Sequence, residues 1–192
     1  MTEKFCIVIL LITLNAGCAL TLSHDRSLSD NTRQAAEFNR RGNDFFFMGQ
    51  YDLAIREYKK AIQLYPRYAK AHSNLGYALL EKKEYDRALV EFSRAIESNP
   101  RYARAYNNRG LVFFAKGQYD RAVLDYNRAI ELDPELAKPY DNRGTIYMLT
   151  GKIEKACSDF VRACDLGECS TYEMLADNGY CNFSQLAMSI PW

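Results

Sequence analysis

"ARAYNNRGLVFFAKGQYDRAVLDYNRAIELDP", residues 103–134, contains the pattern that decides the fold. Sliding the sequence along itself by about 34 residues superposes this stretch on three others. The four segments are 35–68, 69–102, 103–136 and 137–170. Each has glycine at its eighth place and alanine at two later places, so the chain is built from one repeated unit. The glycines are Gly42, Gly76, Gly110 and Gly144.

Small residues at these places let two antiparallel helices pack closely within each segment. In the first three segments a proline (Pro66, Pro100 or Pro134) stops the second helix so that the next helix can begin. A single helix pair cannot bury its own apolar face, so stacked pairs share one elongated core whose ends need caps. The sequence therefore predicts an all-α fold: an α-solenoid of four helix-turn-helix repeats with a C-terminal capping helix.

The repeated segment resembles the tetratricopeptide repeat (TPR), because nearly every signature place is filled from residue 35 to residue 170. The resemblance implies that the first helix of each repeat lines a concave groove for a protein or peptide. Asparagine carries both a donor and an acceptor, so a row of asparagines could pair with the backbone of an extended peptide. Basic residues beside them would suit an acidic or carboxylate-ended segment. The implied groove residues are Asn43, Lys70, Asn74, Arg104, Asn108, Lys138 and Asn142.

The carboxylate-clamp pattern of TPR proteins that bind chaperone tails is only partly present. Asn43, Asn74 and Arg104 fall at matching places. Asn39 and Asn108 replace the first lysine and the last basic residue of that pattern. A chaperone co-factor is therefore not the predicted function.

Two further sets of repeat residues have structural interpretations. At the twelfth place of each repeat, packing between repeats is favoured over ligand pockets. These residues are Phe46, Leu80, Phe114 and Met148.

Helix-to-helix ion pairs are expected within repeats, and repeat two instead has Leu75 opposite Glu91. The expected pairs are Arg41 with Glu57, Arg109 with Asp125, and Arg143 with Asp159.

Four cysteines gather at the end of the repeats, and no cysteine lies between Ala19 and Ala156. Cys157 and Cys164 share one helix face, so an antiparallel capping helix would bring Cys169 near Cys164 and Cys181 near Cys157. We expect these two nested disulfides to tie a cap and tail over residues 171–192. A four-cysteine zinc site is the alternative. It is less favoured because the spacing lacks a Cys-x-x-Cys pair and an exported chain meets an oxidising compartment.

Within that cap, Ser170 or Thr171 is expected to cap a short helix and Gly179 to end it. Its apolar side is expected to consist of Tyr172, Leu175 and Ala176.

The N-terminus indicates export. The apolar run from Phe5 to Leu14 spans only about half of a bilayer's hydrocarbon core as a helix, which favours a signal peptide over a membrane span. The sequence "NAGC" resembles the end of a bacterial lipoprotein signal, which implies a signal peptide over 1–17, a lipidated Cys18 and a polar tether over 18–34. The alternatives are an ordinary signal peptide cut near Ala19, giving a soluble periplasmic or secreted protein, and an uncleaved anchor.

Composition and motifs narrow the function. Lys+Arg total 25 and Asp+Glu 24, so net charge gives no sign of nucleic-acid binding. No phosphate loop, zinc-protease motif or nucleophile elbow occurs, and neither an enzyme, a metal nor a cofactor is predicted. We therefore expect an adaptor at the bacterial envelope, in the periplasm and on the outer membrane, that binds a protein or peptide. Alternatives are a self-associating structural protein and a thiol-based redox protein; the partner and the oligomeric state stay open.

Overall fold

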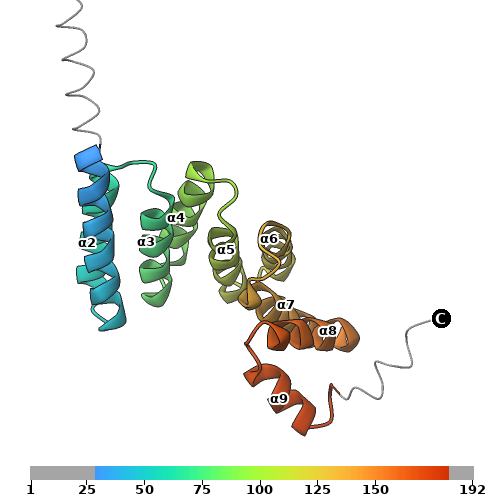
Figure 1. Ribbon diagram of the computed structural model, residues 1–192. Helices are drawn as coiled ribbons and strands as arrows, with labels where there is room; N and C mark the ends of the chain where they lie inside the picture. The colour runs from blue at the N-terminus through green and yellow to red at the C-terminus, as the bar shows by residue number, and fades with distance from the viewer. Residues whose placement is uncertain (1–28, 182–192) are drawn as a thin grey trace, which may run out of the picture. The chain divides into compact units, whose positions relative to one another are not determined.

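The structure, a computed structural model, describes residues 29–181 (Figure 1). The predicted signal peptide, Cys18 and the tail 182–192 lie outside these residues. The chain divides into two compact units, Met1–Pro66 and Arg67–Trp192. In the described part every regular element is a helix, so the all-α prediction is confirmed.

The first unit contains repeat one. A helix over residues 29–47 pairs with α2 (Tyr51–Leu64). The prediction of a polar tether over 18–34 is wrong for its last six residues, because residues 29–34 are helical. The first turn of this helix is held by a hydrogen bond from Thr32 Oγ1 to the Ser29 carbonyl (2.9 Å) and by an ion pair between Arg33 and Asp30 (3.3 Å). Short-range polar contacts thus extend the helix beyond the repeat boundary.

The second unit contains repeats two to four and the cap. Each repeat is an antiparallel pair of helices, and the first helices begin at the residues where the sequence places the repeat boundaries. These first helices are α3 (Ala69–Glu81), α5 (Ala103–Ala115) and α7 (Ala137–Leu149). The second helices are α4 (Tyr85–Ser98), α6 (Tyr119–Leu132) and α8 (Ile153–Asp165). The capping helix is α9 (Ser170–Asp177).

The first helices of this unit form one layer and the second helices another (Figure 1). Neighbouring first helices touch, α3 with α5 and α5 with α7, whereas contacts between neighbouring second helices are fewer. The layer of first helices is therefore the inner side of the curve within this unit, as solenoid geometry requires. We call its exposed surface the inner face.

The prolines end the second helices as expected. α4 stops at Ser98, and Asn99, which precedes Pro100, has an extended backbone with ψ 94°. Proline disfavours helical conformation in the residue before it, so the chain turns there towards the next repeat. The turn between the two helices of each pair needs one residue whose backbone has a positive φ. Gly117 supplies it in repeat three with φ +70°, but repeat two places Lys83 there with φ +60°.

The repeat glycines lie under aromatic rings. A Cβ atom added to Gly110 would lie 2.5 Å from Tyr126 Cε1, and one added to Gly76 would lie 2.9 Å from Phe92 Cε1. Neither distance is compatible with a side chain at the glycine. The missing Cβ therefore lets each ring pack directly on the backbone of the first helix, which explains why glycine recurs at that place.

In repeats one and three the buried ring is a tyrosine, and the hydroxyl groups of these two tyrosines have different surroundings. Tyr58 donates a hydrogen bond to Asn43 Oδ1 (2.9 Å). Tyr126 is fully buried, and among the described residues its hydroxyl has no hydrogen-bond partner. The residue corresponding to Asn43 in repeat three is Leu111, which offers no acceptor. Burial raises the pKa of both tyrosines further above the neutral range.

We expect Tyr126→Phe to leave the free energy of unfolding unchanged or to raise it by about 1 kcal/mol, because it removes an unsatisfied buried hydroxyl. Tyr58→Phe should lower it by about 1 kcal/mol, because it breaks a made hydrogen bond. Urea denaturation of the two variants measures both effects. Equal losses in the two variants would show that the two hydroxyls have equivalent environments.

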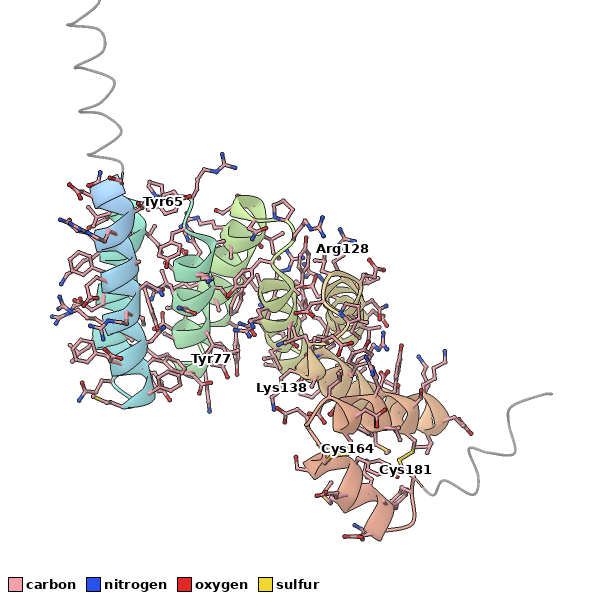
Figure 2. The ribbon with its side chains drawn as sticks, viewed as in Figure 1. Tyr65, Tyr77, Arg128, Lys138, Cys164 and Cys181 are labelled. Atoms are coloured by element: carbon pink, nitrogen blue, oxygen red, sulfur yellow. A yellow bond between two sulfur atoms is a disulfide. The ribbon has the colours of Figure 1, made fainter. Side chains whose placement is uncertain are left out.

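The cap packs on α8 through two of its three expected apolar residues, Tyr172 and Leu175. The structure joins Cys157 to Cys181 and Cys164 to Cys169, the pairing expected from the sequence (Figure 2). The expected side-chain cap is wrong. The N-cap position is Cys169, and no side chain makes a capping hydrogen bond there. The Cys164–Cys169 disulfide positions this helix start instead. At the other end Gly179 has φ +79°, as expected for the residue that ends a helix.

Candidate functional site

The basic residues on the inner face lie at the second place of each first helix. Lys70 on α3 and Arg104 on α5 are exposed, and no ion pair among the described residues involves either of them. Lys138 on α7 differs, since its Nζ lies 2.7 Å from Glu168 Oε2. Glu168 stands in the turn before α9, and the repeat pattern gives no indication of its contact with Lys138. Of the three basic residues predicted for the groove, Lys138 is thus neutralised by an ion pair, and the unpaired positive charge belongs to Lys70 on α3 and Arg104 on α5.

The inner-face asparagines connect neighbouring first helices. Asn108 Nδ2 donates to Ser73 Oγ in the preceding repeat (3.5 Å), and Asn142 Nδ2 donates to Asn107 Oδ1 (3.0 Å). Asn107 Nδ2 in turn donates to Asn108 Oδ1 (3.1 Å). Each amide of the row therefore uses part of its hydrogen-bonding capacity inside the protein. The polar residues at the fifth place, Ser73 and Asn107, were the sequence signal for these contacts.

The remaining predicted groove residues are Asn43 and Asn74. Asn43 belongs to the first unit, where it accepts the hydrogen bond from Tyr58. Asn74 lies on α3 and is half-buried, one place from Ser73 and four from Lys70. Asn74, Lys70, Arg104 and Asn108 come from the adjacent helices α3 and α5, and they form the part of the predicted site that we call the inner-face cluster.

Two of the four apolar residues at the twelfth place, Phe114 and Met148, pack against buried residues. Phe114 contacts the buried cluster around Tyr126 and Phe113, and its ring centroid lies 5.7 Å from that of Tyr119. Met148 contacts the cluster formed by Phe160 and its neighbours. Both side chains therefore contribute to the core of their repeats.

The predicted ion pairs within repeats are present. Arg109 donates two hydrogen bonds to Asp125, each 2.8 Å long, and Arg143 does the same with Asp159. Hydrogen bonding to the carboxylate raises the pKa of each arginine. In the first unit Arg41 Nη2 lies 3.0 Å from Glu57 Oε2.

Each of these arginines in the second unit also reaches the preceding repeat. Arg109 Nη1 donates to Ser93 Oγ on α4 (3.4 Å), and Arg143 Nη1 donates to Asn127 Oδ1 on α6 (2.5 Å). One guanidinium thus joins three helices, the one that carries it and two second helices. The arginines fix the spacing of successive repeats, a structural role.

Repeat two uses a different partner for the same carboxylate position. With Leu75 in place of arginine, His72 Nδ1 lies 2.7 Å from Glu91 Oε2, and Arg94 binds the other oxygen at 2.8 Å. His72 is 4% exposed, so this contact is inside the repeat. The repeat pattern assigns His72 no partner. The sequence nevertheless signals this contact, because Leu75, one helical turn from His72, leaves Glu91 without its usual arginine.

Two hollows of about 380 Å³ each adjoin Arg109 and Arg143, one lined by residues of α4, α5 and α6 and the other by residues of α7 and α8. Arg109 and Asp125 line one, Arg143 and Asp159 the other. Their charged groups are already paired with each other. Within residues 29–181, no group of three or more His, Cys, Asp or Glu side chains is arranged to hold a metal ion. None of the described helices combines the length and apolar character needed to cross a membrane.

Comparison with known proteins agrees with this architecture. Family models described as "Tetratricopeptide repeat" match residues 103–136 and 137–166, and one described as "TPR repeat" matches 42–83 and 76–117. None of the curated proteins compared with the chain matches it in sequence.

Several solved structures are similar. MamA is 27% identical with a TM-score of 0.62, over 77% of this chain and 86% of MamA. The first TPR of Spaghetti (RPAP3), solved with the HSP90 peptide SRMEEVD, is 28% identical with a TM-score of 0.59, over 62% of this chain and 95% of that domain. PilF of Pseudomonas aeruginosa shares the fold, with 24% identity and a TM-score of 0.68 over 72% of this chain and 63% of PilF. The family models together span all four repeats, and the chain belongs to the tetratricopeptide repeat family.

Proposed function

We propose that this protein is a non-enzymatic adaptor that binds an extended segment of another protein along the inner face of repeats two to four. The observation that carries the proposal is the inner-face cluster. Lys70 and Arg104 present unpaired positive charge on adjacent helices, beside the amides of Asn74 and Asn108. Charges that are not used within a protein are available for recognition, and amides can bind the backbone of a peptide.

The chemistry of this cluster favours a segment with acidic residues. The peptide SRMEEVD, which is bound to the first TPR of RPAP3, has three acidic side chains, and that domain is similar to this chain. This chain departs from the carboxylate-clamp pattern at Asn39 and Asn108, so we do not propose the same ligand. The Glu168 carboxylate beside Lys138 further restricts the acidic part of the ligand to α3 and α5.

Charge reversal at the cluster tests the proposal. The double variant Lys70→Glu/Arg104→Glu should weaken binding of the physiological partner at least tenfold, about 1.4 kcal/mol, because it removes two attractive charges and adds two repulsive ones. The partner is identified by crosslinking to the wild-type protein, and its affinity is then measured by titration calorimetry.

The matched control is Arg56→Glu/Lys59→Glu on α2, which makes the same change in net charge at two other exposed residues. This control should bind as the wild type does. If both double variants lose affinity equally, net charge governs binding and the cluster does not. If neither does, the partner binds elsewhere.

We further propose that the adaptor works at the bacterial envelope, held by a lipid on Cys18. The signal-like N-terminus supports this location, and paired cysteines in the cap agree with an oxidising compartment. Intact-mass measurement of the protein extracted from membranes tests it. A mass that begins at an acylated Cys18 supports the lipid anchor, and an unmodified chain that retains Met1 contradicts it.

A further inference from the structure

The hollow lined by α4, α5 and α6 has apolar walls. Phe113 from α5 lines it and is 5% exposed. Leu89 from α4 also lines it and packs against the buried cluster that contains Phe113. Leu124 from α6 is a third lining residue and is 68% exposed. We call this site the repeat-three hollow, and a large exposed apolar side chain at its edge indicates a site of contact.

The repeat-three hollow also carries one positive charge that the protein does not use. The guanidinium carbon of Arg121 lies 4.0 Å from the centroid of the Phe113 ring, and its Nη1 donates to Gln118 Oε1 (2.8 Å). No ion pair among the described residues involves Arg121. The other charged groups of the lining, Arg109 and Asp125, neutralise each other. The hollow therefore has a net positive charge, and Arg121 keeps further N–H donors for a ligand.

The corresponding hollow in repeat four has the same volume but different chemistry. Ser158 stands there at the repeat place of Leu124, and Lys155 at that of Arg121. Glu154 lines the same hollow, so a carboxylate balances the charge of Lys155. Of these two hollows, the one in repeat three combines an exposed leucine with a net positive charge.

We infer that the repeat-three hollow is a second docking site, which receives a large apolar side chain of another protein with an acidic residue directly beside it. The apolar side chain leaves water at Leu89, Phe113 and Leu124, and Arg121 binds the carboxylate. The two groups of the ligand have to be neighbours, because the guanidinium of Arg121 lies directly over the apolar ring.

The size of the hollow indicates that its occupant belongs to a larger molecule. Its volume of about 380 Å³ is near the lower end of the range for ligand pockets, about 300–1,000 Å³. Its edge at Leu124 is open to solvent. A segment of a protein can place one side chain there and make its other contacts outside. No residue of the inner-face cluster lines the hollow, so the two sites are independent.

Titration of the full chain with blocked dipeptides, followed by NMR, tests the inference. The probe is acetyl-Glu-Leu-amide. The comparison probes are acetyl-Gln-Leu-amide, which lacks the charge, and acetyl-Glu-Ala-amide, which lacks the large apolar side chain. We expect the probe to shift the amide resonances of Phe113, Arg121 and Leu124. It should bind about threefold more tightly than either comparison probe, as an exposed ion pair or a half-buried leucine allows.

Two variants separate the contributions of charge and apolar surface. Arg121→Gln should abolish the preference over acetyl-Gln-Leu-amide, and Leu124→Ser the preference over acetyl-Glu-Ala-amide. Both change exposed residues, and far-UV circular dichroism verifies that the helices are retained. The matched controls are Arg56→Gln and Leu149→Ser, which change exposed residues outside the hollow and should keep both preferences.

The inner-face variant Lys70→Glu/Arg104→Glu distinguishes this site from the proposed function. It should bind acetyl-Glu-Leu-amide as the wild type does, with the same shifted resonances. Loss of those shifts in this variant would overturn the inference, and so would equal affinities for the three probes. Tighter binding of acetyl-leucine than of acetyl-Glu-Leu-amide would also overturn it, because the hollow would then receive the end of a chain.

Discussion

Replacing Phe92 with alanine lowers the free energy of unfolding by about 3–5 kcal/mol, the cost of emptying a fully buried aromatic site. Phe92 is 0% exposed, and its ring lies on the backbone at Gly76. No neighbouring side chain can fill the space from the first helix, because the residue there is glycine. The cavity therefore persists and its full cost is measured by urea denaturation.

Val90→Ala is the matched control for this variant. Val90 lies on the same helix two residues earlier and is 48% exposed, so its truncation should cost less than about 0.5 kcal/mol. Similar losses in Val90→Ala and Phe92→Ala would contradict the view that the ring against glycine holds each helix pair together. A double variant Gly76→Ala/Phe92→Ala should lose less stability than Phe92→Ala alone, because the added methyl group occupies part of the cavity and favours the helix.

The second large effect is expected at the cap. Removing the Cys157–Cys181 bridge by the double alanine variant should cost about 3 kcal/mol, and removing Cys164–Cys169 about 2 kcal/mol. The difference arises because the first bridge joins residues 24 apart and the second residues 5 apart. The longer loop loses more conformational freedom in the unfolded chain when it is closed.

Hydrogen exchange locates this effect. α9 packs mainly on α8 and has no fully buried residue, so loss of the longer bridge should accelerate exchange of α9 amides first. Amides of α3 and α4 should exchange as in the wild type. A uniform acceleration across all repeats would show that the bridge stabilises the whole array instead of its end.

The repeat pattern made most of the fold predictable. A glycine and an aromatic ring at fixed spacing pack two helices against each other, and a proline at fixed spacing ends the second helix. Gly110 and Tyr126 illustrate this, since neither position accepts another arrangement without a clash or a cavity. The arginine pairs were predictable for the same reason. Their places recur sixteen residues apart, across one helix pair.

What the sequence did not predict are contacts between residues that depart from the pattern. His72 binds Glu91 because Leu75 stands where arginine is expected, and this substitution is visible only when three places are compared together. Glu168 reaches Lys138 from a turn that exists in one repeat only. The helical start at residues 29–34 depends on local polar contacts that repeat periodicity does not contain.

For the asparagine row, the sequence predicted the helices that carry the residues but not their hydrogen-bond partners. The asparagine row does lie on adjacent first helices, but Asn108 and Asn142 already bond to neighbouring repeats. Spacing along one helix indicates which side a residue faces. It does not indicate the distance to a side chain on the next helix, and that distance decides whether an amide is fully available to a ligand.

The arginines that join three helices also bear on how such an array could grow. Arg143 meets Asn127 behind it and Asp159 ahead of it, and Arg109 meets Ser93 and Asp125 in the same way. If the gene segment for repeat three were duplicated, the new copy would find an Asn127 before its arginine and bring its own Asp125. Both junctions would be complete at once, without compensating mutations. Duplication of repeat two would create a junction where Leu75 offers no such link. Of these two repeats, repeat three is therefore the one whose duplication would lengthen the array with all its links in place.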